Sequence, residues 1–178
     1  MTWEAASEEE KTESWLQFKT ELFKIYGETQ IVWPKGCDET CFRWFQILEE
    51  EDFRFELRYT REEIIERLSH QDVLFFFVLK GEMPEILVLG YKLCDSDLPI
   101  FYLDTIAVRQ RGRGIGHIVM EFIIKRTQKR EYHAIVLDTE ETDEKNIPLQ
   151  RFYAEHGFKI TARSDSGDIT MRLDLAKS

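Results

Sequence analysis

The sequence predicts an α/β fold in which helices pack on a mixed β-sheet. Two β-rich runs, at residues 73–80 and 85–93, are separated by a short turn with a glycine and a proline, which is typical of a β-hairpin. A predicted strand–helix–strand crossover follows, at residues 100–108, 114–130 and 134–139. Because a hairpin pairs its strands antiparallel and a crossover pairs them parallel, we expect a mixed sheet, α+β in detail.

The other elements follow from apolar periodicity and from turn signals. Helical spacing predicts helices at residues 7–26, 38–51, 60–69 and 148–156. Short β-rich runs predict strands at residues 29–33, 158–163 and 168–175. The helix near residue 60 begins at a capping box, Thr60-Arg-Glu-Glu63. The first helix is expected to bury an apolar face made of Trp15, Leu16, Phe18, Leu22, Phe23 and Ile25.

Length and composition are those of an ordinary globular protein. The chain has 178 residues, of which 43% are apolar and 33% are charged. This length favours a single domain, which we divide into an N-terminal helical extension (1–27) and a core (28–178). The longest apolar run, residues 73–79, is far shorter than the ~20 residues of a membrane span. The acidic N-terminus does not resemble a signal peptide.

Cysteine and histidine usage indicates neither disulfides nor a metal site. The three cysteines are Cys37, Cys41 and Cys94, and an odd number without a secretory signal argues against a disulfide framework. The four histidines are scattered along the chain at no metal-binding spacing. We therefore expect a cytoplasmic protein that binds no metal.

The charge balance argues against a nucleic-acid partner. The net charge is −10, whereas nucleic-acid-binding domains normally carry a basic surface. Basic residues do gather locally, at 109–113 and at 125–130. A small anionic ligand held at one such place is compatible with this pattern.

The segment Arg109-Gln-Arg-Gly-Arg-Gly-Ile-Gly116 connects the predicted strand 100–108 to the predicted helix 114–130. A helix N-terminus exposes unpaired N–H groups and a partial positive charge. Glycines let the backbone approach a phosphate, and arginines add bidentate donors. The segment therefore indicates a pyrophosphate cradle, with a plain turn as the alternative. It matches neither G-x-G-x-x-G, whose sixth position is His117 here, nor the P-loop.

Spaced motifs resemble the GNAT acetyltransferase family. Arg111-Gly-Arg-Gly-Ile-Gly116 matches the family's coenzyme A signature, Q/R-x-x-G-x-G/A, and Ile106-Ala-Val108 resembles the end of the preceding strand. Phe152-Tyr-Ala-Glu-His-Gly-Phe158 resembles the family's FYxxxGF ending, and Asn146 lies seven residues before Tyr153.

The resemblance extends from about residue 29 to residue 175, with two departures. Residues 53–64 also resemble the link between the family's first two helices. Only two residues separate Val108 from Arg111, fewer than is common in the family. The N-terminal helix is additional, and the sequence leaves three roles open for it: packing on the sheet, covering the acceptor cleft or mediating a homodimer.

The resemblance implies transfer of an acetyl group from acetyl-CoA to a primary amine. The turn's backbone N–H groups would hold the pyrophosphate, and the strand before it would pair with the pantetheine arm. The cofactor-binding residues implied by the resemblance are Ile106, Ala107, Val108, Arg111, Gly112, Arg113, Gly114, Ile115, Gly116 and Asn146.

This chemistry needs one group that takes a proton from the amine and one that protonates the departing thiolate. The resemblance assigns the second role to Tyr153, because a tyrosine of pKa ~10 can protonate a thiolate. Candidates for the first role are Asp104 and Asp138. Glu140, Glu141 or no dedicated base are the remaining alternatives.

The expected acceptor is a small-molecule or peptide amine, such as a polyamine, an aminoglycoside, a lysine or a protein N-terminus. Acidic residues near the expected cleft favour such a cation. Two other functions are compatible with the sequence: an acyl-CoA-binding GNAT-fold module without catalysis, and an anion or nucleic-acid adaptor. The net charge disfavours the adaptor.

Overall fold

The structure, a computed structural model, describes residues 12–52, 58–94, 97–141, 148–165 and 167–176. Its helices are α1 (Glu13–Tyr26), α2 (Glu39–Asp52), α3 (Arg61–Leu68), α4 (Ile115–Lys129) and α5 (Leu149–Glu155). Its strands are β1 (Gln30–Val32), β2 (Gln71–Lys80), β3 (Met83–Lys92), β4 (Ile100–Val108), β5 (Ala134–Thr139), β6 (Lys159–Arg163) and β7 (Ile169–Asp174). Every predicted element within the described residues is present, so the predicted α/β fold is confirmed.

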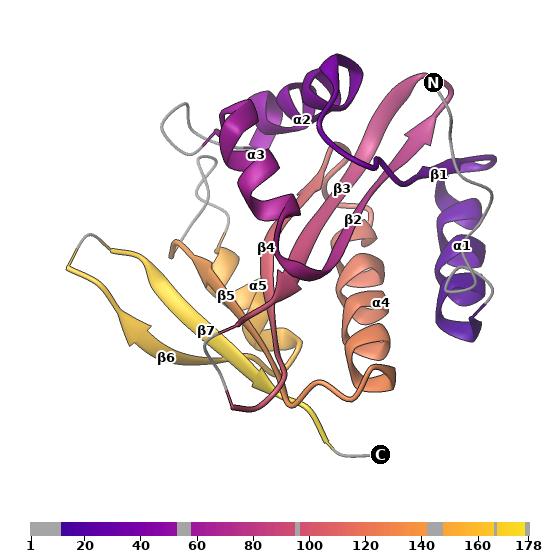
Figure 1. Ribbon diagram of the computed structural model, residues 1–178. Coiled ribbons are helices and arrows are strands. Elements are labelled where there is room, and N and C mark those ends of the chain that lie inside the picture. Colours follow the sequence, from indigo (N-terminus) through magenta and orange to yellow (C-terminus); the bar gives the residue numbers. More distant parts are fainter. Residues whose placement is uncertain (1–11, 53–57, 95–96, 142–147, 166, 177–178) are drawn as a thin grey trace.

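The described strands form one mixed sheet in the order β1-β2-β3-β4-β5-β7-β6 (Figure 1). Neighbours pair antiparallel except β4 and β5, which are parallel and joined by α4, as the predicted crossover requires. The predicted capping box is also present, since Thr60 Oγ1 accepts from the Glu63 N–H while Glu63 accepts from the Thr60 N–H.

The parallel strands β4 and β5 pair over only a short distance. Their register joins Ile100, Phe101 and Tyr102 to residues 134–136, whereas β4 continues to Val108. Beyond Tyr102, no described strand pairs with β4 on the side of β5. This edge of β4, which continues beyond the pairing with β5, leads directly into the glycine-rich turn.

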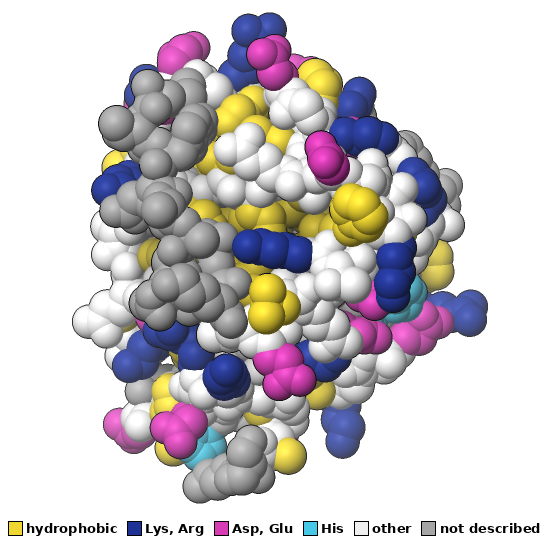
Figure 2. Space-filling model, turned by 90° about the vertical axis from the view of Figure 1, so that its right-hand side faces the viewer, with side chains coloured by type: hydrophobic (Ala, Val, Ile, Leu, Met, Phe, Trp, Pro, Cys, Tyr) yellow, Lys and Arg dark blue, Asp and Glu magenta, His cyan; other side chains and the backbone are white. Residues whose placement is uncertain are grey.

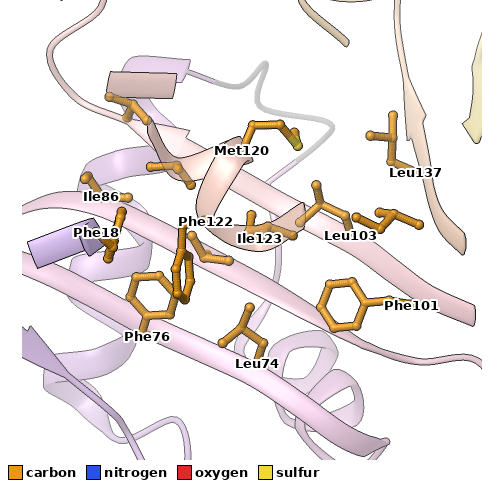
Figure 3. Packing of buried hydrophobic residues seen from close by; sticks show 14 of the residues in the cluster. Phe18, Leu74, Phe76, Ile86, Phe101, Leu103, Met120, Phe122, Ile123 and Leu137 are labelled. Carbon is orange, nitrogen blue, oxygen red and sulfur yellow. The ribbon is translucent and has the colours of Figure 1, made fainter. Parts of the chain in front are cut away.

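Helices cover both faces of the sheet (Figure 1). On one face, α1 and α4 bury a core in which Phe122 stacks on Phe18 at 4.5 Å between ring centroids and meets Phe76 edge-on at 5.9 Å (Figure 3). On the other face, α2 and α3 cover a second core that contains Phe45 and Phe77. The central strands β2 and β3 are therefore buried on both faces, which explains the unbroken apolar run in β2, whereas β6 at the sheet edge is exposed.

Helix α1 buries a narrower face than the sequence predicted. Trp15, Phe18, Leu22 and Tyr26 are buried, but Leu16 and Phe23 are 56% and 60% exposed. The physical reason is helical geometry, because Leu16 and Phe23 are seven residues apart and share a stripe beside the buried one. Figure 2 shows the face that carries α1, where apolar surface lies among charged side chains. Helix α1 thus completes the core and leaves part of its apolar surface exposed.

The structure also describes the cysteines and the lengths of the helices. Cys37 and Cys41 are buried and Cys94 is exposed, all as free thiols. None of the helices in the described ranges is long and apolar enough to cross a membrane.

Candidate active site

The glycine-rich turn has the backbone that a phosphate cradle needs. Gly112 and Gly114 have positive φ values of 78° and 76°, and Gly114 is the N-cap of α4. A Cβ atom added at either glycine would meet nothing within 4 Å, so the space beside the turn is open. The first N–H groups of α4 have no partner within the helix. The residues present therefore fit a pyrophosphate group. Glycine is suited to both positions because it adopts positive φ angles without strain.

Gly116 has a different role, because it allows close helix packing. A Cβ atom there would lie 3.3 Å from the Phe152 ring of α5. The absence of a side chain thus brings the first turn of α4 against the helix that carries Tyr153. His117 and His156 reinforce this contact, with Nδ1 of the first 3.3 Å from Nε2 of the second.

The arginines of the turn do not all point to the open space. Arg109 donates to the buried carboxylate of Glu85, and Gln110 Nε2 donates to the same carboxylate at 3.2 Å. Arg113 donates to Gln110 Oε1 at 2.7 Å and to the Ile25 carbonyl at 3.0 Å. Arg111 is partly exposed. The Arg113 guanidinium is thus already bonded to other groups, and the predicted phosphate contact of Arg113 is better suited to its backbone N–H.

A β-bulge in β4 places Asp104. Gly90 pairs with Leu103 and Leu89 pairs with Thr105, so Asp104 is the extra residue. The bulge changes which residues face α4: Phe101 and Leu103 do so before it, and Ile106 and Val108 do so after it. Asp104 and Thr105 consequently share the opposite face, and Thr105 Oγ1 donates to Asp104 Oδ2 at 3.0 Å.

The Asp104 carboxylate is buried and already bonded to neighbouring side chains. Its side chain is 3% exposed, Arg67 Nε donates to Oδ1 at 3.0 Å, and the Tyr59 hydroxyl donates to Oδ2 at 3.0 Å. The Arg67 guanidinium also lies over the Tyr59 ring, 4.1 Å from its centroid. Asp104 thus joins β4 to α3 and to the segment before it.

Asp138 has the opposite character, because it lies exposed where β4 and β5 stop pairing. The Tyr102 hydroxyl donates to Asp138 Oδ2 at 2.9 Å, and Thr170 Oγ1 donates to Oδ1 at 2.6 Å. Tyr102 is the last residue of β4 that pairs with β5. Each carboxylate oxygen thus accepts one hydrogen bond and keeps a second lone pair.

Glu49 is an acidic residue that the sequence analysis did not single out. It is 2% exposed, accepts from the Tyr59 N–H at 3.0 Å through Oε1, and has no described partner at Oε2. Burial, with the nearby carboxylates of Glu63 and Asp104, raises the pKa of Glu49 to about 7. The helical pattern alone gave no signal, because Glu49 stands next to Glu50, which is exposed on the same helix.

Aromatic side chains line the face that holds Asp104 and Asp138. Tyr91 stacks on His70 at 4.0 Å between ring centroids and packs against Tyr102 at 5.4 Å. Burial, together with Asp104, raises the pKa of Tyr91 to about 12. We call the surface formed by Tyr59, Arg67, Tyr91, Tyr102, Asp104 and Asp138 the acidic-aromatic face.

Tyr153 lies on α5 next to the cradle helix. Its ring is half-buried and packs edge-on against Phe152 and Phe158, at 5.2 and 5.8 Å between centroids. Burial raises its pKa to about 12, so the hydroxyl keeps its proton at neutral pH. Of the other predicted residues, Ile106, Ala107 and Val108 lie on the part of β4 that continues beyond the pairing with β5, while Asn146 is outside the described residues.

Comparison with known proteins agrees with this architecture. The model of the acetyltransferase (GNAT) family matches residues 40–158. The chain therefore belongs to the GNAT acetyltransferase family. No curated protein sequence matches it.

Several solved structures share the fold. The ribosomal-protein-S18-alanine N-acetyltransferase from Escherichia coli is 15% identical, with a TM-score of 0.63 over 85% of this chain and 96% of that one. The NatC complex bound to Gag peptide and CoA is 19% identical, with a TM-score of 0.65 over 84% and 99%. An aminoglycoside 6'-acetyltransferase type Ii is 15% identical, with a TM-score of 0.64 over 85% and 99%. At these identities the similarity shows the fold.

Proposed function

We propose that this chain transfers an acetyl group from acetyl-CoA to a primary amine. The observation that carries the proposal is the edge of β4 that continues beyond the pairing with β5, because its two ends differ chemically. The cradle lies at the C-terminal end of this edge, and the Tyr102–Asp138 pair lies where the edge begins. Six extended residues span about 20 Å, so a long acyl-pantetheine arm fits along the strand.

The proposed cofactor contacts are made mainly by backbone. The N–H groups of residues 111–116 would hold the pyrophosphate, and Ile106, Ala107 and Val108 would pair with the pantetheine amides. Arg111 would add a charged donor to the phosphates. Asn146 remains a predicted contact from the family motif.

The acceptor is proposed to be a cationic amine that binds from the acidic-aromatic face. Asp138 is an exposed acidic side chain, and Glu140 and Glu141 follow it within three residues. A carboxylate beside aromatic rings suits an ammonium group, because the carboxylate and the ring faces each attract a cation. The related structures include enzymes named for a protein alanine and for an aminoglycoside, so the fold accommodates acceptors of different size.

We assign the proton-accepting role to Asp138 rather than to Asp104. The amine must lose one proton as its nitrogen bonds to the acetyl carbon, and the departing thiolate must gain one. Asp138 keeps lone pairs open to solvent and can take the amine proton directly or through a water molecule. Asp104 is buried against Arg67 and Tyr59, so we assign it a positioning role. Tyr153 would protonate the thiolate.

The test is thiol release from acetyl-CoA in the presence of a polyamine, an aminoglycoside, and peptides with a free lysine or N-terminal amine. At least one acceptor should support turnover. Tyr153→Phe should lower kcat by about 100-fold or more while the dissociation constant for CoA stays unchanged. Wild-type protein that binds CoA but turns over no acceptor would instead be an acyl-CoA-binding module.

A matched control tests whether the loss of activity is specific to the Tyr153 hydroxyl or follows from removing any tyrosine hydroxyl. Tyr132 is buried, and its hydroxyl is bonded to Asp72 beyond the C-terminal end of α4, away from the proposed site. Tyr132→Phe should lower stability and leave kcat unchanged. Equal loss of kcat in both variants contradicts the assignment of Tyr153.

A further inference from the structure

A chain of side-chain hydrogen bonds ties the glycine-rich turn to two distant elements. It begins at Glu85 on β3, passes through Gln110 and Arg113 in the turn, and ends at the carbonyl of Ile25 in the last turn of α1. The residues joined are up to 88 positions apart in the sequence. None of these contacts belongs to the regular sheet or helix hydrogen bonding.

The β3 end of this chain is firmly fixed. Glu85 is 3% exposed, and its carboxylate accepts from Arg109 and from Gln110. The Arg109 N–H also donates to the Glu85 backbone carbonyl at 2.9 Å. A buried carboxylate with charged and amide donors resists displacement, because breaking the contacts leaves a buried charge unpaired.

The α1 end is fixed by the core. The Arg113 guanidinium donates to the Ile25 carbonyl at 3.0 Å and lies 5.9 Å from the centroid of the buried Tyr26 ring. The last carbonyls of a helix lack intrahelical donors and carry a partial negative charge. The Arg113 guanidinium supplies a hydrogen-bond donor to one of them and a positive charge beside it. Helix α1 itself is anchored by Trp15 and Phe18.

We propose that Gln110 and Arg113 are positioning residues that hold the cradle in its binding conformation by connecting it to β3 and α1. Two glycines with positive φ leave the turn many alternative conformations, and ordering them upon binding costs affinity. The connection removes part of that cost before the ligand arrives. It also gives the additional N-terminal helix a role in the site. The identity of the ligand rests on the proposed function, whereas the order of the turn does not.

Hydrogen exchange and CoA titration together test this proposal. Arg113→Ala and Gln110→Ala should each speed exchange of the backbone amides in 109–116 in the unliganded protein. Each should weaken CoA binding by about fivefold, the effect of one lost hydrogen bond. The double variant should be little worse than either single variant, because both break the same chain. Binding should keep its wild-type dependence on salt.

Two controls make the result specific. Lys125 Nζ donates to Gln17 Oε1 at 3.1 Å and joins α1 to α4 away from the turn, so Lys125→Ala should change neither exchange at 109–116 nor CoA affinity. Arg111→Ala should weaken CoA binding and reduce its salt dependence without loosening the turn, because a direct phosphate contact is screened by salt.

Two outcomes overturn the proposal. One is an Arg113→Ala protein whose turn exchanges as in the wild type; the other is loss of salt dependence in that variant, which would make Arg113 a direct phosphate ligand. If wild-type protein fails to bind CoA, the proposed function fails. The exchange rates of the unliganded variants then decide the positioning role by themselves.

Discussion

The cradle and the acidic-aromatic face are built in opposite ways. The cradle consists of consecutive residues whose backbone does the binding, with Gly112 and Gly114 in positive-φ conformations. The acidic-aromatic face is assembled from side chains on α3, β3, β4 and β5 and from the segment before α3. A backbone site can be encoded in one short motif. A side-chain site depends on contacts such as Tyr59 to Asp104, which lie 45 residues apart.

The two regions also differ in electrostatic cost. The cradle presents backbone N–H groups to open space and carries the partly exposed Arg111, so charge there is well hydrated. Within the acidic-aromatic face Asp104 is buried, and beside the face burial raises the pKa of Glu49 to about 7. Substitutions in the cradle should therefore act on cofactor affinity, and those around the other region on turnover or on stability.

The sharpest test within the acidic-aromatic face replaces its two aspartates separately. Asp138→Asn should lower kcat/KM by about 100-fold or more, because an amide cannot accept the amine proton. The variant should unfold at nearly the wild-type temperature, since Asp138 is exposed. Steady-state kinetics and thermal unfolding measure the two effects.

Asp104→Asn is the matched control. It leaves Arg67 without its carboxylate partner and should lower the free energy of unfolding by about 1.5–3 kcal/mol, the contribution of a hydrogen bond to a charged group. Activity per folded molecule should fall much less than in Asp138→Asn. An inactive but stable Asp104→Asn beside an active Asp138→Asn would reverse the roles assigned to the two residues.

Glu49 predicts a pH dependence of stability. Its folded-state pKa of about 7 lies above the ordinary value of 4.5, so between these pH values the folded chain binds more protons than the unfolded chain. Its stabilising contribution is complete below about pH 4.5 and is lost as the pH rises through 7. The loss is up to about 3 kcal/mol, from 1.36 kcal/mol per pKa unit.

Glu49→Gln should remove this pH dependence, because an amide does not titrate. Its oxygen can still accept from the Tyr59 N–H, so the hydrogen bond is kept. Urea unfolding at pH 5 and pH 8 measures the difference. The variant should be more stable than the wild type at pH 8 and similar to it at pH 5. The prediction is contradicted if the wild type, compared with Glu49→Gln, becomes more stable as the pH rises from 5 to 8.

The cradle is tested by a pair of glycines with similar backbone angles. Gly114 and Gly81 have φ values of 76° and 62°, and an added Cβ atom meets nothing within 4 Å at either. Alanine at either position should cost about 1 kcal/mol of stability through backbone strain. Only Gly114→Ala should weaken CoA binding, by about tenfold, because its methyl group occupies the space left for the phosphates. Similar CoA affinities for the two variants would argue against the cradle.

The sequence predicted the elements well and the side-chain environments less well. Strand β5 begins and ends as predicted, and α4 starts where the glycine turn indicated, because turn residues and periodicity act locally. The exposure of Leu16 and Phe23 was not predicted, since every apolar residue of α1 was assigned to one face. The burial of Glu49 and Glu85 was not predicted either, because a glutamate carries no sequence signal for the elements that will cover it.

The sequence by itself determined the order of strands and helices, the place of the glycine-rich turn and the family to which the chain belongs. These follow from local conformational preferences and from short motifs. Only the tertiary structure decided that Asp104 is buried against Arg67 while Asp138 is exposed beside Tyr102. It also turned Arg113 toward α1. The reason is that solvent exposure and long-range hydrogen bonds exist only after the sheet and its covering helices have come together.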